Sequence, residues 1–210
     1  MNLPISQATL ATAAPSPVAS MPVNASSLLK AAYQLLPHLH QGQAIDAARL
    51  RAAMTESFGG SDGEGAWDWK AAYDACEASQ ILFLRKFGLA MRSRAPTPGA
   101  FLAMLDKLAH LFPTHTRRSE ESQALQQFST PIALGYVAAI AAALTPGDLL
   151  LEPSAGTGLL AIFADLAGAR LLLNELAATR ANLLAQLFAD CSITQHDAAH
   201  IDDSRSCTRR

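Results

Sequence analysis

The stretch Leu149-Leu-Leu-Glu-Pro-Ser-Ala-Gly-Thr-Gly-Leu-Leu-Ala161 decides the fold class of this chain. Residues 149–151 form an apolar run that predicts a buried parallel strand, and the residues from Leu159 onward predict a helix. A tight turn with two glycines, Gly156 and Gly158, lies between them. This order is typical of an open α/β sheet that holds a nucleotide-like ligand beyond the carboxyl ends of its strands. The same turn also occurs where glycine is needed only for tight packing.

Glu152, at the end of the predicted strand, indicates which kind of ligand the turn accepts. A carboxylate there repels phosphate and suits a cationic ligand. The dinucleotide fingerprint G-x-G-x-x-G tolerates Ala161 at its third position, but a pyrophosphate would lie against Glu152. No Gly-Lys-Ser/Thr follows, so a phosphate loop does not fit. We therefore expect S-adenosylmethionine, which carries an ammonium and a sulfonium group and no phosphate, rather than NAD or ATP.

Two further predicted strands end in acidic residues. Residues 170–175 predict a short strand whose Glu175 lies 17 positions after Gly158. That distance is close to the about 20 residues expected for a carboxylate that accepts ribose hydroxyls. Residues 192–197 predict a third strand, and Asp197 at its end would accept a hydrogen bond from an adenine amino group. Glu175 alone is better explained as a solvated loop acid before a helix, whereas three acid-ended strands in order form a more specific pattern.

The glycine turn and a segment upstream resemble those of a known family. Glu152-Pro-Ser-Ala-Gly-Thr-Gly158 is similar to the cofactor-binding motif of class I S-adenosylmethionine-dependent methyltransferases, in the version found in DNA adenine-N6 methylases. Gln126-Gln-Phe-Ser-Thr-Pro131 resembles the segment that these enzymes place before the first strand, where it closes over the methionine end of the cofactor. The resemblance implies the following cofactor-binding residues: Phe128, Ser129, Thr130, Pro131, Glu152, Ser154, Ala155, Gly156, Thr157, Gly158, Glu175 and Asp197.

A helix cap is an alternative explanation of the upstream segment. Ser129 or Thr130 would cap a helix that begins at Pro131, since proline suits the first helical position. The two explanations are compatible. A narrower resemblance covers residues 118–203, which look like the methyltransferase region near the start of large bacterial Strawberry-notch-like helicase proteins.

The sequence departs from the family where the target amine would be bound. Amino-methylating enzymes carry a fourth-strand motif, Asn/Asp/Ser-Pro-Pro-aromatic, whose polar groups bind the amine and whose ring stacks on the flipped base. No Pro-Pro occurs in this chain, which ends shortly after the third predicted strand. We therefore expect the cofactor-binding half without the catalytic half, and we assign no catalytic residue.

Two functions stay open on this evidence. One is an S-adenosylmethionine-dependent methyltransferase of DNA adenine-N6 methylase ancestry. The other is a non-catalytic cofactor-binding or interaction module, such as the truncated front end of a helicase-like protein. The missing Pro-Pro-aromatic motif favours the second for this chain in isolation, and the cofactor motif favours the first as its ancestry.

Composition divides the chain into five parts. Residues 1–26 are rich in Ala, Pro and Ser and predict a disordered arm. A helical region is expected over 27–112, a linker over 113–122, an incomplete cofactor-binding domain over 123–203 and an irregular basic tail over 204–210. The fold class is therefore α/β: a partial Rossmann-like parallel sheet of about three strands, preceded by an α-helical region. Helices are expected at 27–38, 45–54, 67–91, 96–111, 132–144, 159–167 and 177–188.

The role of the helical region stays open between a target-recognition or docking module and a packing extension of the sheet. The net charge of -2 and the pI of about 6.3 disfavour strong autonomous nucleic-acid binding, so DNA is expected at most as a weak partner. A helicase-like protein or a missing C-terminal region is the other expected partner. The longest apolar helix, at 132–144, is too short for a bilayer, so no membrane contact is expected.

Cysteine and histidine patterns argue against a disulfide framework and a metal site. The three cysteines, Cys76, Cys191 and Cys207, are widely spaced and suit a reducing cytoplasm. His196 and His200 have the spacing of the metalloprotease motif H-E-x-x-H. A strand end that runs into a loop would not present both rings on one helix face, so we expect no metal.

Overall fold

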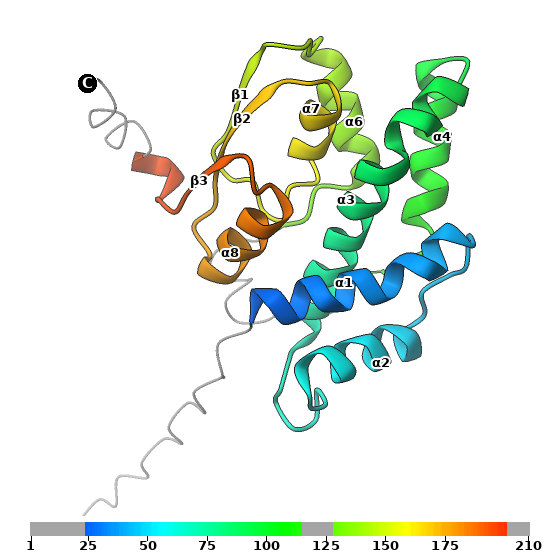
Figure 1. Cartoon of the computed structure of the whole chain (residues 1–210), viewed down its shortest axis with the longest axis vertical. Helices are drawn as coiled ribbons and strands as arrows, with labels where there is room; N and C mark the ends of the chain where they lie inside the picture. Colours follow the sequence, from blue (N-terminus) through cyan, green and yellow to red (C-terminus); the bar gives the residue numbers. More distant parts are fainter. Residues whose placement is uncertain (1–23, 115–127, 201–210) are drawn as a thin grey trace, which may run out of the picture.

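The structure, a computed structural model, describes residues 24–114 and 128–200 and has the α/β fold class that the sequence predicts (Figure 1). The helical region, residues 24–114, contains α1 (Ala25–His40), α2 (Ala47–Phe58), α3 (Trp69–Arg94) and α4 (Pro98–Ala109). The sheet region, residues 128–200, contains α6 (Ile132–Ala141), β1 (Leu149–Glu152), α7 (Ala161–Leu166), β2 (Arg170–Asn174), α8 (Ala178–Leu187), β3 (Ser192–Thr194) and the short 3₁₀ helix η1 (Ala198–His200). Most of the predicted arm and linker, and all of the predicted tail, lie outside the described residues.

Each helix of the helical region begins at a polar residue whose side chain accepts a hydrogen bond from the first turn. Such a cap satisfies a backbone N–H group that has no partner within the helix. The four capping residues are Asn24, Asp46, Asp68 and Thr97. α2 runs past its expected end at residue 54 and stops where Gly59 adopts a left-handed conformation, φ 74°.

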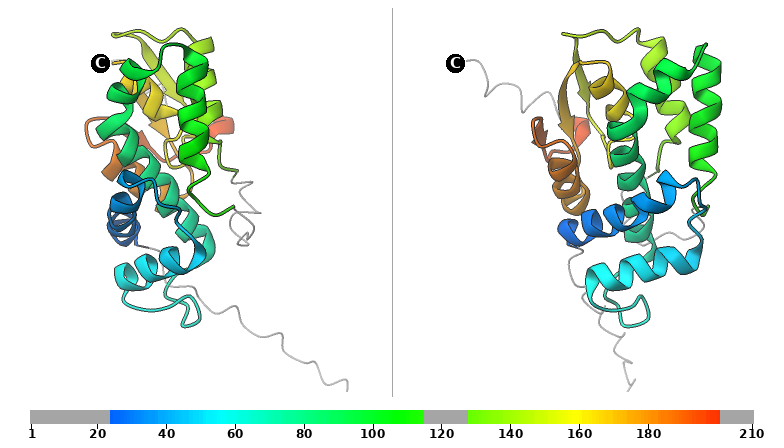
Figure 2. Two further views of the ribbon diagram at one scale, coloured as in Figure 1. Left: turned by 90° about the vertical axis from the view of Figure 1, so that its right-hand side faces the viewer. Right: turned by 45° about the vertical axis from the view of Figure 1, so that its right-hand side comes forward.

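α3 joins the two regions. It packs against α1 and α4 on its own side and against α7 and α8 of the sheet region (Figures 1 and 2). One continuous hydrophobic core results, which includes Leu35 of α1, Ile81 and Leu84 of α3, Ile162 of α7 and Leu183 of α8. The helical region is therefore packed against the helices of the sheet region, and the two share their buried apolar surface.

The three strands form a parallel sheet in the order β1-β2-β3, with Leu151 of β1 opposite Leu172 of β2. Right-handed crossovers place α7 and α8 on the same face. Because side chains alternate along a strand, Leu171 and Leu173 point to that face and are buried. On the other face Leu149 is 55% exposed, and Leu151 and Leu172 are each 38% exposed.

The expectation of a strand buried on both faces at 149–151 is therefore wrong. A continuous apolar run predicts two covered faces, but among the described residues helices cover only one. β1 is also an edge strand within the described sheet, since β2 is its one neighbour there.

The expected cap of the following helix is wrong as well. α6 begins at Ile132, with Pro131 in the capping position, and no side chain makes a cap hydrogen bond there. Ser129 and Thr130 instead line a cavity, and Ser129 shares a hydrogen bond with Glu77 of α3. No helix in the described part of the chain is long and apolar enough to cross a membrane.

Candidate functional site

The carboxyl ends of the three strands are fastened together by Asn174, a residue that the sequence analysis did not single out. Its side-chain amide donates to the carbonyl oxygens of Pro153 (2.9 Å) and His196 (2.8 Å). Its oxygen accepts from the His196 N–H group (2.9 Å) and from the Thr194 hydroxyl (2.8 Å). All of its hydrogen-bonding capacity is used to hold the loop after β1 beside the loop after β3, which gives this edge of the sheet a fixed shape.

Glu175 holds the glycine turn against the start of α8. One carboxylate oxygen accepts from the Gly156 N–H group (2.8 Å) and the other accepts from the Ala177 N–H group (2.9 Å). The side chain is buried, yet it lines a cavity at the strand ends. A carboxylate has about four lone-pair positions, so each oxygen can accept one further hydrogen bond from a ligand.

The two glycines of the turn have different roles. At Gly158, φ is 103° and a Cβ atom would lie 2.4 Å from Phe188 Cε2, so α8 packs against the bare backbone. At Gly156, φ is 58° and a Cβ atom would meet only Arg180 Nη1, at 4.0 Å. Tight packing therefore explains Gly158, whereas Gly156 leaves its backbone open toward a cavity.

The strand-end cavity has a volume of about 340 Å³ and lies beyond the carboxyl ends of the strands. Ligand pockets in proteins usually have volumes of about 300–1,000 Å³. It brings five of the predicted residues together: Phe128, Ser154, Gly156, Glu175 and Asp197. Pro153, Leu176, Arg180, His196 and Ala198 complete its wall.

The turn cavity is a narrow space of about 30 Å³ that adjoins the strand-end cavity. Phe128, Ser154, Gly156 and Arg180 line both. Of the predicted residues it adds Ser129, Thr130, Ala155 and Thr157. A space of this size holds about one water molecule.

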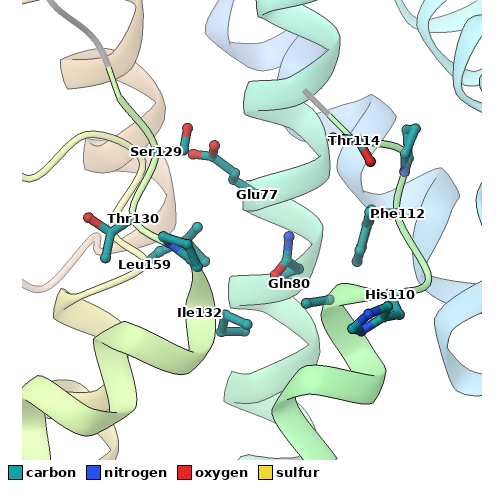
Figure 3. Close-up of a pocket in the computed structure, with 12 residues that line it drawn as sticks. Glu77, Gln80, His110, Phe112, Thr114, Ser129, Thr130, Ile132 and Leu159 are labelled. Atoms are coloured by element: carbon teal, nitrogen blue, oxygen red, sulfur yellow. The ribbon is translucent and has the colours of Figure 1, made fainter. Parts of the chain in front are cut away.

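The α3 cavity, of about 490 Å³, lies on the other side of the turn cavity (Figure 3). The two have Glu77, Ser129, Thr130 and Leu159 in common. Its remaining lining residues are Gln80, Ala109, His110, Phe112, Pro113, Thr114, Pro131 and Ile132. The three cavities thus follow one another from the strand ends to the helical region.

A buried ion-pair cluster connects α3 to the site. Arg180 of α8, which lines both the strand-end cavity and the turn cavity, donates to Asp74 of α3 through Nε (3.0 Å) and Nη2 (2.8 Å). Lys70 pairs with the other oxygen of Asp74 at 2.9 Å. Burial works to lower the pKa of Arg180, but Asp74 outweighs it and raises this pKa. Arg180 is therefore a fixed cation whose Nη1 faces Gly156.

Glu77 of α3 adds a further carboxyl group, which lines both the turn cavity and the α3 cavity. Burial raises its pKa, the neighbouring Asp74 raises it further, and Arg180 and the hydrogen bonds from Ser129 and Thr157 offset part of the effect. The Thr157 hydroxyl donates to Glu77 Oε2 at 2.5 Å. The Thr157 side chain therefore points toward α3, and it holds the turn against the helical region.

Glu152 and Asp197 lie in different surroundings. Glu152 is half-buried at the end of β1, where burial raises its pKa and the Ser154 N–H group partly offsets this. It is not among the residues that line the three cavities. Asp197 lies beyond the end of β3, lines the strand-end cavity and accepts from the Ala199 N–H group at 3.0 Å. The structure therefore brings Glu175 and Asp197 to one cavity but leaves Glu152 outside it.

The remaining predicted residues are placed as follows. Pro131 lines the α3 cavity, and Gly158 is enclosed by the packing of α8. His196 lies in a loop and His200 in η1, so the two rings do not share a helix face. No group of His, Cys, Asp and Glu within residues 24–114 and 128–200 could hold a metal ion. Comparisons of the chain with protein-family models, curated proteins and solved structures give no match.

Proposed function

We propose that this chain binds S-adenosylmethionine at the carboxyl edge of its sheet, as the cofactor-binding half of a methyltransferase-like protein of DNA adenine-N6 methylase ancestry. One observation carries the proposal: Glu175, Asp197 and the open backbone of Gly156 line the same cavity. These are the groups that the sequence motif assigns to the cofactor. Their convergence depends on the tertiary structure, since 41 positions separate Gly156 from Asp197.

The adenosine part of the cofactor fits the strand-end cavity. Each oxygen of Glu175 can accept one ribose hydroxyl in addition to its backbone N–H group. Asp197 uses Oδ1 for Ala199, and its other oxygen is the acceptor for the adenine amino group. The Phe128 ring, which is 68% exposed at the border of the cavity, offers an apolar surface for the adenine plane.

The methionine part extends toward the turn cavity, where Arg180 binds its carboxylate. Nη1 of Arg180 takes part in neither bond to Asp74 and lies beside Gly156, so it is a charged donor held in place by the other two nitrogens. The turn cavity is too small for the methionine part as it stands, so binding requires residues 128–131 to move outward. When bound, the cofactor supplies a transferable methyl group on its sulfonium.

The second candidate function, a non-catalytic cofactor-binding or interaction module, is favoured by the open face of the sheet. Leu149, Leu151 and Leu172 are exposed together there, although parallel sheets normally have both faces covered. In this alternative the chain binds the cofactor and associates with a helicase-like protein or with DNA, without transferring a methyl group itself.

Calorimetric titration of the chain with S-adenosylhomocysteine, the demethylated cofactor, tests the proposal, with NAD as the control ligand. We expect micromolar binding of S-adenosylhomocysteine and none of NAD. Gly156→Asp should abolish binding, because its side chain enters the cavity. Gly42→Asp is the matched control, since Gly42 is also left-handed (φ 65°), has open space around it and lines none of the three cavities. A folded chain that binds no S-adenosylhomocysteine would refute the proposal.

A further inference from the structure

The α3 cavity contains a largely buried polar side chain that makes no hydrogen bond to the described residues. Gln80 of α3 is only 7% exposed, and it lines the cavity between Ile132 and Phe112 (Figure 3). No hydrogen bond joins its amide to a described residue, and the amide is not among the fully enclosed polar groups without a partner, so it opens to the cavity. A primary amide presents an N–H donor beside a carbonyl acceptor. The missing partner is therefore a ligand or water with an acceptor beside a donor.

The other lining residues narrow the chemistry of that ligand. No lysine or arginine is among the described lining residues, and the carboxyl group of Glu77 also lines the cavity, so these residues disfavour a phosphate or a carboxylate. The Phe112 ring and the side chains of Ile132 and Leu159 provide apolar walls. A flat, uncharged compound of modest size suits these walls better than a flexible or charged one.

His110 adds a second directional group. Its Nδ1 lies 2.6 Å from the carbonyl oxygen of Asp106, and a carbonyl can only accept, so Nδ1 carries the proton. In the neutral ring Nε2 is then an acceptor. Gln80 and His110 come from α3 and from the end of α4, and both line the cavity next to Phe112 (Figure 3). Gln80 and His110 thus offer two acceptors and the N–H donors of one amide beside an aromatic ring, and Glu77, Thr114, Ser129 and Thr130 add further polar groups to the cavity wall.

The position of the cavity gives its ligand a role. It shares Glu77, Ser129, Thr130 and Leu159 with the turn cavity, toward which the methionine part of the cofactor extends in the proposed function. A methyl acceptor must lie in line with the methyl group of the sulfonium, which joins the methionine part to the adenosine, and a compound in the α3 cavity would approach it from the methionine side.

We propose that the α3 cavity is the binding site of a small, uncharged, planar amino compound, such as an aminopyrimidine or a primary carboxamide. Gln80 pairs with the edge of this compound that has a donor beside an acceptor, and Phe112 packs against its plane. As the methyl acceptor, its amino nitrogen would bond to the methyl carbon while the sulfonium S–C bond breaks, S-adenosylhomocysteine leaves and the N–H proton passes to water. This role rests on the proposed function, whereas binding rests on Gln80 and the cavity alone. The helical region would then supply the acceptor site.

The test uses 2-aminopyrimidine as the probe and pyrimidine, which lacks the amino donor, as its control. Ligand binding to the full chain is followed by NMR, with and without saturating S-adenosylhomocysteine. We expect 2-aminopyrimidine to bind at least about tenfold more tightly than pyrimidine. Gln80→Leu, which keeps the side-chain size and removes both hydrogen-bonding groups, should remove this preference. Gln186→Leu, on the exposed surface of α8, should leave it unchanged.

Each outcome separates the two proposals. Equal binding of the two probes, or an unchanged preference in a folded Gln80→Leu chain, would overturn the α3 site. If S-adenosylhomocysteine binds and 2-aminopyrimidine does not, the cofactor proposal stands and the α3 site is refuted. If 2-aminopyrimidine binds through Gln80 and S-adenosylhomocysteine does not bind, the α3 cavity is a ligand site and the proposed function fails.

Discussion

The sheet region and the helical region contribute different chemistry to one series of cavities. The sheet region supplies backbone groups and short side chains at the strand ends, such as Ser154 and Gly156. The helical region supplies long polar side chains that stand three residues apart on α3: Asp74, Glu77 and Gln80. The sheet region therefore provides the charged groups of the proposed cofactor site, Glu175, Arg180 and Asp197, while α3 holds Arg180 in place through Asp74 and adds Glu77 to the turn cavity.

The two regions also differ in how they are covered. The helical region buries its apolar faces among its own helices and against α7 and α8, whereas the sheet leaves the face of Leu151 and Leu172 exposed. α3 belongs to the shared core through its apolar side chains, and it belongs to the site through Asp74 and Glu77. Variants of α3 and of the glycine turn should separate the contribution of α3 to stability from its contribution to the site.

The largest effect is expected from breaking the ion pair between the regions. Asp74→Asn removes the carboxylate that pairs directly with both Arg180 and Lys70, and loss of one partner of a buried pair costs about 3–5 kcal/mol. Urea unfolding should report this loss. The matched control is Arg51→Gln, which removes an exposed pair with Asp62 within the helical region and should cost about 1 kcal/mol or less. Equal losses in the free energy of unfolding for Asp74→Asn and Arg51→Gln would contradict a stabilising role of the buried ion pair.

The two glycines of the turn should respond differently to alanine. Gly158→Ala combines a strained backbone with an overlap against Phe188, so we expect a loss of about 3 kcal/mol or more in the free energy of unfolding. Gly156→Ala meets no close atom and should cost only the left-handed strain, about 1–2 kcal/mol. Phe188→Leu should relieve part of the Gly158→Ala loss in a double-mutant cycle. If the losses of the two single variants simply add in the double variant, the overlap between residue 158 and Phe188 is contradicted.

Glu77 should make stability depend on pH. Its pKa in the folded chain is raised, chiefly by burial, so the folded state holds the proton more tightly than the unfolded state does. Stability from this group is fully present below the unfolded pKa and is lost as pH rises through the folded pKa. Glu77→Gln cannot ionise, so its free energy of unfolding should exceed that of the natural chain at neutral pH and approach it in acid. If the two chains differ in free energy of unfolding by the same amount from acid to neutral pH, the raised pKa of Glu77 is contradicted.

The smallest effect is expected on the open face of the sheet. Leu172→Ala should change the free energy of unfolding by about 0.5 kcal/mol or less, because its side chain is already partly in water. Leu173→Ala, one position along the same strand and fully buried under the helices, should cost about 2–5 kcal/mol. Urea denaturation of both variants measures the contrast. A large loss for Leu172→Ala would show that this face is covered in solution.

The strand-turn-helix pattern of 149–161 was sufficient to predict the fold class, because apolar runs and glycine turns are local signals. The same local signals placed Gly156, Glu175 and Asp197 at strand ends, and parallel strands necessarily bring such residues to one edge. Local patterns could not show which face of the sheet is covered. They therefore overestimated the burial of Leu149 and Leu151.

The contribution of the helical region was missed for a different reason. Arg180 lies 106 positions from Asp74, and a single arginine on a predicted helix is usually solvated. Nothing local indicates that these two residues meet. One signal was present, since Asp74, Glu77 and Gln80 recur every three residues within the mostly apolar stretch 71–81. Polar residues that recur along one face of a helix are a reason to expect that this face contributes to a site shared with another region of the chain.

The most direct test of the shared site compares two ligands that differ only in the amino-acid part. Calorimetry would compare S-adenosylhomocysteine with 5′-methylthioadenosine, which lacks the carboxylate, on the natural chain and on Arg180→Lys. The account predicts that S-adenosylhomocysteine binds about tenfold to a hundredfold more tightly, through the bond to Arg180. In Arg180→Lys this advantage should shrink while the affinity for 5′-methylthioadenosine stays the same. Equal affinity of the natural chain for both ligands, or an undiminished advantage in the variant, would contradict a site built jointly by the strand ends and α3.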